Sequence, residues 1–330
     1  MEKRKILATH GLFDLARWIL EPHLDVEYWT AGGQIPRREL LVRVRDKEGL
    51  ICLLTEQVNS ELLDTAPKLR IVANMAVGHD NIDLGACTQR GVVATNTPGV
   101  LEETTADLAW ALMMAVARRV VEGDLVVRSG QWQGWDFDQL CGTDVWGKTL
   151  GIVGFGRIGR AMARRARGFG MGVVYASRTR APEEVEKELR AEYRTLEALL
   201  EEADFVSLHV PLTEDTRGMI ATPQLARMKP TAFLINASRG AVVDEAALVS
   251  ALERGKIAGA ALDVYEEEPF VHPGLRRANV VLTPHLGSAS METRTKMACT
   301  AAENVVALFK RQRPPNALNP EVLEKKNPPR

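Results

Sequence analysis

The segment Leu150-Gly151-Ile152-Val153-Gly154-Phe155-Gly156-Arg157-Ile158-Gly159 decides the fold of this chain. Its apolar start predicts a buried strand, and the glycine-rich turn after it leads into a predicted helix over 160–169. In such a turn the first glycine allows the tight bend, the second lets the backbone approach a pyrophosphate, and the third lets the helix pack close to the strand. The free N–H groups of the helix then face the phosphates. A second predicted strand over 172–176 closes a βαβ unit, and this context favours a dinucleotide site over an ordinary turn.

The same alternation of strands and helices runs through the rest of the chain and predicts parallel sheets. A length of 330 residues predicts about two domains. We expect an α/β protein of two Rossmann-like or flavodoxin-like doubly wound domains, in which a dinucleotide-binding domain (104–286) is inserted into a substrate domain (1–103 plus 287–330). The predicted strands are 6–8, 26–28, 49–54, 69–73 and 92–95, then 150–154, 172–177, 204–208, 232–236, 258–262 and 280–283. A last helix over 291–311 returns to the first domain, and the proline-rich tail 312–330 is expected to be extended or partly disordered.

Composition restricts the class of protein. Apolar content of 45% and charged content of 26% are ordinary for a globular protein. With a net charge of −1, the chain as a whole has no electrostatic attraction to nucleic acid or to an anionic membrane. The four cysteines lack CxxC spacing, so we expect neither a zinc site nor a disulfide framework. No signal peptide and no apolar run of membrane-spanning length is visible. These features predict a cytoplasmic protein without a metal.

A long helical pattern over 104–121 is apolar around much of its circumference, which implies burial on several sides, as between domains or subunits. The polar segment over 131–146 follows and carries Trp132, Trp135 and Trp146. Loops of this length usually have a function or contact a partner. The segment is interpreted as a partner contact, with a surface loop plugged by aromatic side chains as the alternative.

Three polar residues, Arg239, Glu268 and His285, each follow one of the last three predicted strands. In a doubly wound sheet, ligands bind beyond the carboxyl ends of the strands. Hydride transfer to a carbonyl beside a carboxylate needs a cation that binds the carboxylate, and Arg239 suits this role. It also needs a proton donor for the developing alkoxide, which His285 can be. A carboxylate that orients the donor is the third requirement, and Glu268 can provide it. Taken singly, each residue also fits a structural role, namely a helix-entry turn, a solvated acidic run or a buried histidine. Their joint position at strand ends favours catalysis.

At this point the chain resembles the D-isomer-specific 2-hydroxyacid dehydrogenases, in their glyoxylate/hydroxypyruvate reductase branch. The resemblance extends from about residue 5 to about residue 322. Its motifs are specific in combination. The matching segments are Ala73–Asp83, Gly151–Gly159, Ser207–Thr213, Met228–Pro230, Asn236–Gly240, Leu262–Pro269 and Thr283–Ala289.

The resemblance implies NAD(P)H-dependent reduction of glyoxylate or hydroxypyruvate to glycolate or D-glycerate, with a proton from His285. It assigns the catalytic set to Arg239, Glu268 and His285. The substrate contacts that it implies are Arg239, His285, the amides of Val77 and Gly78, and Ser288. It also implies a homodimer formed through helix 104–121 and the arm 122–149. The resemblance implies that Thr105, Pro211 and Thr216 line the cofactor and that Asp263 receives the nicotinamide carboxamide. With the glycine-rich turn and the end of the second strand, the positions expected to bind the cofactor are Thr105, Gly154, Gly156, Arg157, Ile158, Gly159, Ser177, Arg178, Thr179, Arg180, Val210, Pro211, Thr216, Ala237, Ser238, Arg239, Asp263, His285 and Gly287.

The segment Ser177-Arg178-Thr179-Arg180 bears on the choice of cofactor. NAD-specific folds place an acid at the end of the second strand to bind the ribose 2′-OH, whereas an arginine there accommodates a 2′-phosphate. No acid is present here, which favours NADPH. The alternative is that both arginines are surface residues and NADH binds.

The same fold and catalytic trio also occur with other functions. A dinucleotide-sensing, corepressor-like interaction protein keeps the same catalytic trio, although the chain lacks an obvious peptide-binding extension. Phosphoglycerate dehydrogenase is disfavoured because no regulatory domain follows residue 322. Phosphite oxidation is disfavoured because Met75-Ala76-Val77-Gly78 lacks the lysine of that branch. The preferred 2-keto acid cannot be derived from motifs, since one methylene group changes binding by only about 1–3 kcal/mol.

Overall fold

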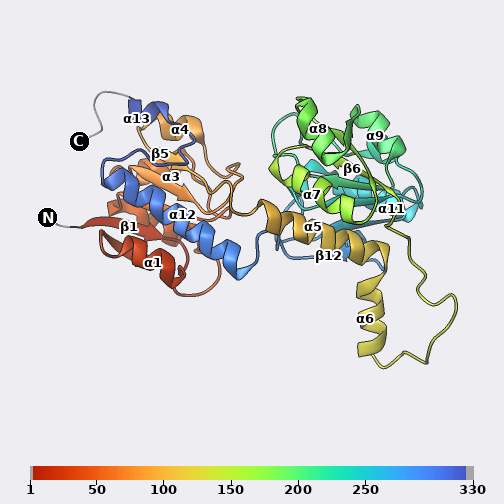
Figure 1. Ribbon diagram of the computed structural model, residues 1–330. Coiled ribbons are helices and arrows are strands. Elements are labelled where there is room, and N and C mark those ends of the chain that lie inside the picture. The colour runs from red at the N-terminus through yellow and green to blue at the C-terminus, as the bar shows by residue number, and fades with distance from the viewer. Residues whose placement is uncertain (1–2, 325–330) are drawn as a thin grey trace. The chain divides into compact units, whose positions relative to one another are not determined.

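The computed structural model describes residues 3–324 and divides the chain into two compact units. The first unit combines the segment up to Leu101 with the segment from Ala289 onward, and the second unit is Glu102–Ser288. Each unit contains one parallel sheet covered by helices on both faces (Figure 1). The predicted fold class of two doubly wound α/β domains is therefore confirmed.

The first unit is built on a five-stranded sheet in the order β2-β1-β3-β4-β5. Residues alternate along β1, so that Ile6 packs toward α1 and α12 while Leu7 packs toward α2, α3 and α4. Because both of their faces are buried, the inner strands β3 and β4 are almost entirely apolar, whereas β1 and the edge strand β2 each carry two charged residues. The strands are β1 Arg4–Ala8, β2 Leu24–Tyr28, β3 Gly49–Cys52, β4 Ile71–Asn74 and β5 Val93–Thr95; the helices are α1 Asp14–Leu20, α2 Arg37–Arg43, η1 Val44–Asp46, α3 Ser60–Thr65, α4 Leu84–Gln89, α12 Met291–Phe309 and α13 Glu321–Glu324.

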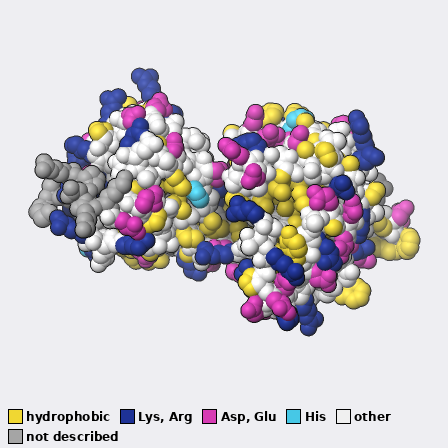
Figure 2. Space-filling model, turned by 90° about the horizontal axis from the view of Figure 1, so that it is seen from above, with side chains coloured by type: hydrophobic (Ala, Val, Ile, Leu, Met, Phe, Trp, Pro, Cys, Tyr) yellow, Lys and Arg dark blue, Asp and Glu magenta, His cyan; other side chains and the backbone are white. Residues whose placement is uncertain are grey.

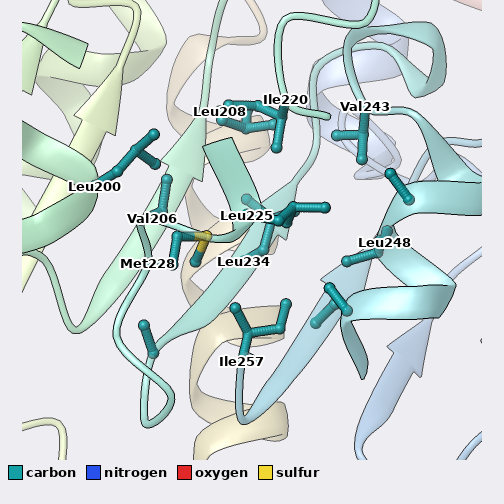
Figure 3. Packing of buried hydrophobic residues seen from close by; sticks show 14 of the residues in the cluster. Leu200, Val206, Leu208, Ile220, Leu225, Met228, Leu234, Val243, Leu248 and Ile257 are labelled. Atoms are coloured by element: carbon teal, nitrogen blue, oxygen red, sulfur yellow. The ribbon is translucent and has the colours of Figure 1, made fainter. Parts of the chain in front are cut away.

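The second unit is built on a seven-stranded parallel sheet in the order β12-β11-β10-β9-β6-β7-β8. One face packs against α5 and α7, and the other packs against α9, α10 and α11. On the latter face, Val206 and Leu234 of the sheet belong to one buried cluster with Leu225 and Leu248 of the helices (Figure 3). The strands are β6 Thr149–Val153, β7 Gly172–Ala176, β8 Ala191–Tyr193, β9 Phe205–Leu208, β10 Phe233–Asn236, β11 Gly259–Leu262 and β12 Val280–Leu282. The helices are α5 Glu102–Ala117, α6 Val120–Arg128, α7 Arg157–Gly168, α8 Glu183–Leu189, α9 Leu196–Glu202, α10 Thr222–Leu225, η2 Gly240–Val242, α11 Glu245–Glu253 and η3 Pro273–Leu275.

The predicted helix over 104–121 is wrong in its extent, because two helices occupy this region. Helix α5 ends at Ala117 and α6 begins at Val120, with Arg119 between them in the left-handed region at φ 52°. The returning arm ends α5, since the Thr143 N–H donates to the Ala117 carbonyl at 2.8 Å. A Cβ atom on Gly142 would lie 2.4 Å from the same oxygen, so only glycine allows this approach.

The second sheet also has one more strand than the six that were predicted. Strand β8 is three residues long and lies at the edge of the sheet, where a short, half-exposed segment carries little apolar signal. In the tail, α13 forms where an extended chain was expected, and residues 325–330 of that prediction lie outside the described residues. Within residues 3–324, none of the helices combines the length and the apolar character needed to cross a bilayer.

Candidate active site

Arg239 lies just beyond the carboxyl end of β10, where the chain turns into η2. Asn236, the last residue of β10, holds this turn: its Nδ2 donates to the Arg239 carbonyl at 2.9 Å, and its Oδ1 accepts from the Ser238 N–H and hydroxyl. A Cβ atom on Gly240 would lie 1.8 Å from the Tyr265 carbonyl carbon. The turn is therefore packed directly on the backbone after β11. This packing fixes the position of the Arg239 backbone, from which the side chain extends.

Glu268 and His285 form a hydrogen-bonded pair at the ends of β11 and β12. His285 Nδ1 lies 2.8 Å from Glu268 Oε2, and the other carboxylate oxygen accepts from the Tyr265 N–H at 3.2 Å. Burial by itself raises the pKa of Glu268, but the hydrogen bond and charge of His285, with smaller effects of Tyr265 and Arg239, outweigh it and lower the pKa below its ordinary value. The ionised carboxylate accepts the Nδ1 proton and orients the ring, which leaves Nε2 for proton transfer.

The turn that carries His285 is held by Asp263. His285 has a φ of 55°, which is uncommon for a residue other than glycine. The fully buried Asp263 carboxylate accepts from the Thr283 hydroxyl (2.6 Å) and from the N–H groups of Leu286 (2.7 Å) and Gly287 (2.8 Å). The resemblance assigned Asp263 to the cofactor alone, and this second role, as the anchor of the His285 turn, was missed by sequence reasoning.

Another histidine of this unit, His209, is half-buried. It follows β9, and its Nε2 lies 2.8 Å from the Ser207 hydroxyl. Burial lowers the pKa of His209 to about 4. The ring is therefore neutral at neutral pH, and His285 stays the better candidate.

The glycine-rich turn has the shape that a dinucleotide requires. Gly154 has a φ of 94°, and a Cβ atom there would lie 2.6 Å from the His209 carbonyl oxygen. A Cβ atom on Gly159 would lie 2.2 Å from the Gly154 oxygen, whereas one on Gly156 would meet nothing within 4 Å. Gly156 precedes α7 and provides no side-chain cap. The first N–H groups of α7, beginning with Arg157 and Ile158, have no acceptor within the helix. The residues present thus fit a pyrophosphate.

The two arginines in the loop after β7, Arg178 and Arg180, have different environments. Arg180 donates from Nε (2.9 Å) and Nη2 (2.8 Å) to the carboxylate of Glu186 on α8, which also accepts from the buried Tyr175 hydroxyl at 2.5 Å. The Ala181 N–H donates to the same hydroxyl. Arg178 is exposed, and among the described residues it has no ion-pair partner. Glu186 and Tyr175 were not identified from the sequence, because neither belongs to the dinucleotide motif.

The other positions assigned to the cofactor in this unit lie after strands of the same sheet or on α5. The Thr216 hydroxyl donates to the Pro211 carbonyl at 2.6 Å and so closes the loop that begins with Val210. A Cβ atom on Gly287 would lie 3.5 Å from the Thr105 side chain, so α5 lies beside the turn after β12. Ala237 and Ser238 follow β10. Ser177 and Thr179 follow β7, and the Ser177 hydroxyl donates to the Thr179 carbonyl. Ser288, which was assigned to the substrate, is the last residue of the unit.

Val77 and Gly78 belong to the first unit, where they form the turn between β4 and α4. Both residues are half-buried, and their carbonyl oxygens accept from the side chains of Asn96 (2.8 Å) and Asn74 (2.9 Å), respectively. Their N–H groups were assigned to the substrate carboxylate.

Comparison with known proteins agrees with this geometry. The family model for the NAD binding domain of D-isomer specific 2-hydroxyacid dehydrogenases matches residues 110–287. A glyoxylate reductase of Thermococcus litoralis is 51% identical, with 99% of this chain and 100% of the relative covered. A glyoxylate reductase of Pyrococcus furiosus is 50% identical, with 99% and 98% covered.

Solved structures give the same result. A protein of Thermus thermophilus has a TM-score of 0.90 and 45% identity, with 95% of this chain and 99% of that chain covered. The NADPH-dependent glyoxylate/hydroxypyruvate reductase of Sinorhizobium meliloti, solved with NADP and malonate, has a TM-score of 0.85 and 34% identity, with 96% and 97% covered. The fold, the turn and these matches define an oxidoreductase that uses a nicotinamide dinucleotide. The chain belongs to the D-isomer specific 2-hydroxyacid dehydrogenase family.

Proposed function

We propose that this protein reduces glyoxylate and hydroxypyruvate to glycolate and D-glycerate. The observation that carries the proposal is the His285–Glu268 pair at 2.8 Å, which lies with Arg239 at the carboxyl edge of one sheet. Relatives that are about half identical over nearly their whole length carry the name glyoxylate reductase, which supports this choice of substrate.

Each side chain has one task in this reaction. The Arg239 guanidinium binds the substrate carboxylate, and the amides of Val77 and Gly78 are the proposed further donors to it. His285 gives the Nε2 proton to the carbonyl oxygen, while Glu268 holds Nδ1 and stabilises the orientation of the ring. The bound dihydronicotinamide supplies the hydride.

The preferred cofactor in this proposal is NADPH, and Arg178 is the residue that selects it. The segment 177–180 contains no acid for a ribose 2′-OH, and the exposed Arg178 guanidinium is available to a 2′-phosphate. Arg180 is already paired with Glu186, so its charge is neutralised. The NADP complex of the Sinorhizobium meliloti reductase is consistent with this preference in a similar fold.

A homodimer through 104–121 and the arm 122–149 is also part of the proposal. Helix α6 and the loop after it extend away from the body of their unit (Figure 1), and α6 has no buried residue. The projecting segment exposes large apolar side chains, which favours a second copy as the covering surface. These are Val120, Leu125, Val127, Trp132, Trp135 and Phe137, each at least 55% exposed.

We further propose a cytoplasmic enzyme without nucleic-acid or membrane partners. All four cysteines are free, which suits a reducing compartment. On the face shown in Figure 2, basic side chains are interspersed with acidic ones, so this face has no single-sign patch that would attract a polyanion.

The test is nicotinamide absorbance with purified protein, glyoxylate or hydroxypyruvate, and NADPH or NADH in parallel. Oxidation of the cofactor that is faster with NADPH supports both the reaction and the preference. Tight cofactor binding without turnover on either keto acid contradicts the proposed reaction. Sedimentation of the protein as a monomer at micromolar concentration contradicts the dimer.

A further inference from the structure

The turn after β4 has three successive carbonyl groups that are all fixed by hydrogen bonds. The Ala76 carbonyl accepts from the Thr97 N–H at 2.8 Å. The Val77 carbonyl accepts from Asn96 Nδ2 at 2.8 Å, and the Gly78 carbonyl accepts from Asn74 Nδ2 at 2.9 Å. Three consecutive peptide planes are therefore held by residues that are themselves buried.

Fixing a carbonyl also fixes the N–H group that follows it. A trans peptide unit is planar, and its C=O and N–H bonds point in opposite directions. The N–H groups of Val77, Gly78 and His79 thus point away from the three buried donors. Among residues 3–324, no backbone or side-chain acceptor for these N–H groups is present in the structure. Such a row of backbone donors is suited to an anion.

Asn74 is itself held rigidly. It is the last residue of β4, is fully buried, and also contacts the Asn81 carboxamide, with Nδ2 3.2 Å from Asn81 Oδ1. Asn81 in turn donates to the carbonyls of Leu53 and Glu56 at 3.0 Å each. The two carboxamides connect the turn after β4 to the loop after β3, so Asn74 cannot rotate without breaking several buried hydrogen bonds.

We propose that Asn74 is a positioning residue of the carboxylate site: by holding the Gly78 carbonyl, it sets the His79 N–H as a third backbone donor beside those of Val77 and Gly78. This inference rests on the proposed function, in which the first two amides bind the substrate carboxylate. An alanine at this position would leave the Gly78 carbonyl unsatisfied and its peptide free to rotate.

The test compares Asn74→Ala with Asn319→Ala. Asn319 is a matched control, because it is a buried asparagine of the same unit that makes three hydrogen bonds, to Ala94, Val92 and Thr88, and none to the turn. We expect Asn74→Ala to raise the glyoxylate KM and the oxalate Kd by about tenfold, with little change in kcat or in the NADPH Kd. Asn319→Ala lowers the unfolding temperature and leaves both substrate constants unchanged.

Equal glyoxylate KM values for the two variants overturn the inference. A lower unfolding temperature of Asn74→Ala with unchanged substrate constants also overturns it. If Asn74→Ala does not fold, the similarly sized Asn74→Leu is measured in the same way, since it removes the donor without burying a charge. Oxalate binding to the NADPH complex, followed by calorimetry, needs no turnover. A wild type that binds oxalate without reducing glyoxylate contradicts the proposed function alone, and the oxalate constants then decide the role of Asn74. A wild type that neither binds oxalate nor reduces glyoxylate contradicts both the proposed function and the role of Asn74.

Discussion

The different environments of Arg178 and Arg180 lead to a quantitative prediction about cofactor choice. A charge-assisted hydrogen bond contributes about 1.5–3 kcal/mol, and the exposure of Arg178 places its contribution at the lower end. Arg178→Ala is therefore expected to raise the NADPH Kd about tenfold and to leave the NADH Kd nearly unchanged.

The control removes the Arg180–Glu186 pair without changing the net charge. Arg180→Ala alone would expose the charge of Glu186, whose pKa is lowered to about 2, mainly by the hydrogen bond from Arg180. The double variant Arg180→Ala/Glu186→Gln avoids this effect. We expect it to change the ratio of the NADPH and NADH constants by less than about threefold.

The assay is fluorescence titration of each variant with NADPH and NADH, repeated with 2′,5′-ADP and 5′-AMP to isolate the phosphate contact. These measurements require binding only, so they remain informative if no keto acid is reduced. A double variant that loses as much NADPH selectivity as Arg178→Ala would refute the assignment of the 2′-phosphate to Arg178.

Three further predictions concern the catalytic pair, the glycine turn and acid stability. His285→Ala should lower kcat by a factor of about 10²–10⁴ with cofactor binding retained, and Glu268→Gln should lower it less; normal turnover in His285→Ala would exclude the proton-transfer role. Gly156→Ala should fold normally and weaken NADPH binding, while Gly159→Ala should lower the unfolding temperature, because its Cβ would lie 2.2 Å from a backbone oxygen. Since the pKa of Glu186 falls from 4.5 to about 2 in the folded state, its stabilisation is complete above the unfolded-state pKa and is lost as the pH falls toward 2. Denaturation midpoints measured between about pH 6 and about pH 2 should therefore fall less steeply in Glu186→Gln.

Local patterns predicted much of the fold, because each buried strand of a parallel sheet has a local signal in the sequence. Buried strands are short apolar runs, so the sequence located β6, β9 and β10 nearly to their observed ends. The edge strand β8 was missed because only one of its three residues is buried. The break between α5 and α6 was also missed, since it depends on Gly142 and Thr143 returning to the Ala117 carbonyl from a later part of the chain.

By itself, the sequence determined the doubly wound fold class, the family and the positions of Arg239, Glu268 and His285 at strand ends, because motifs place residues along one strand or one turn. Only the tertiary structure showed that Asp263 anchors the His285 turn, that Glu186 neutralises Arg180 and that Asn74 holds the Gly78 carbonyl. The physical reason is that hydrogen bonds depend on distance and direction in space. No spacing in the chain reveals which buried donor faces which acceptor.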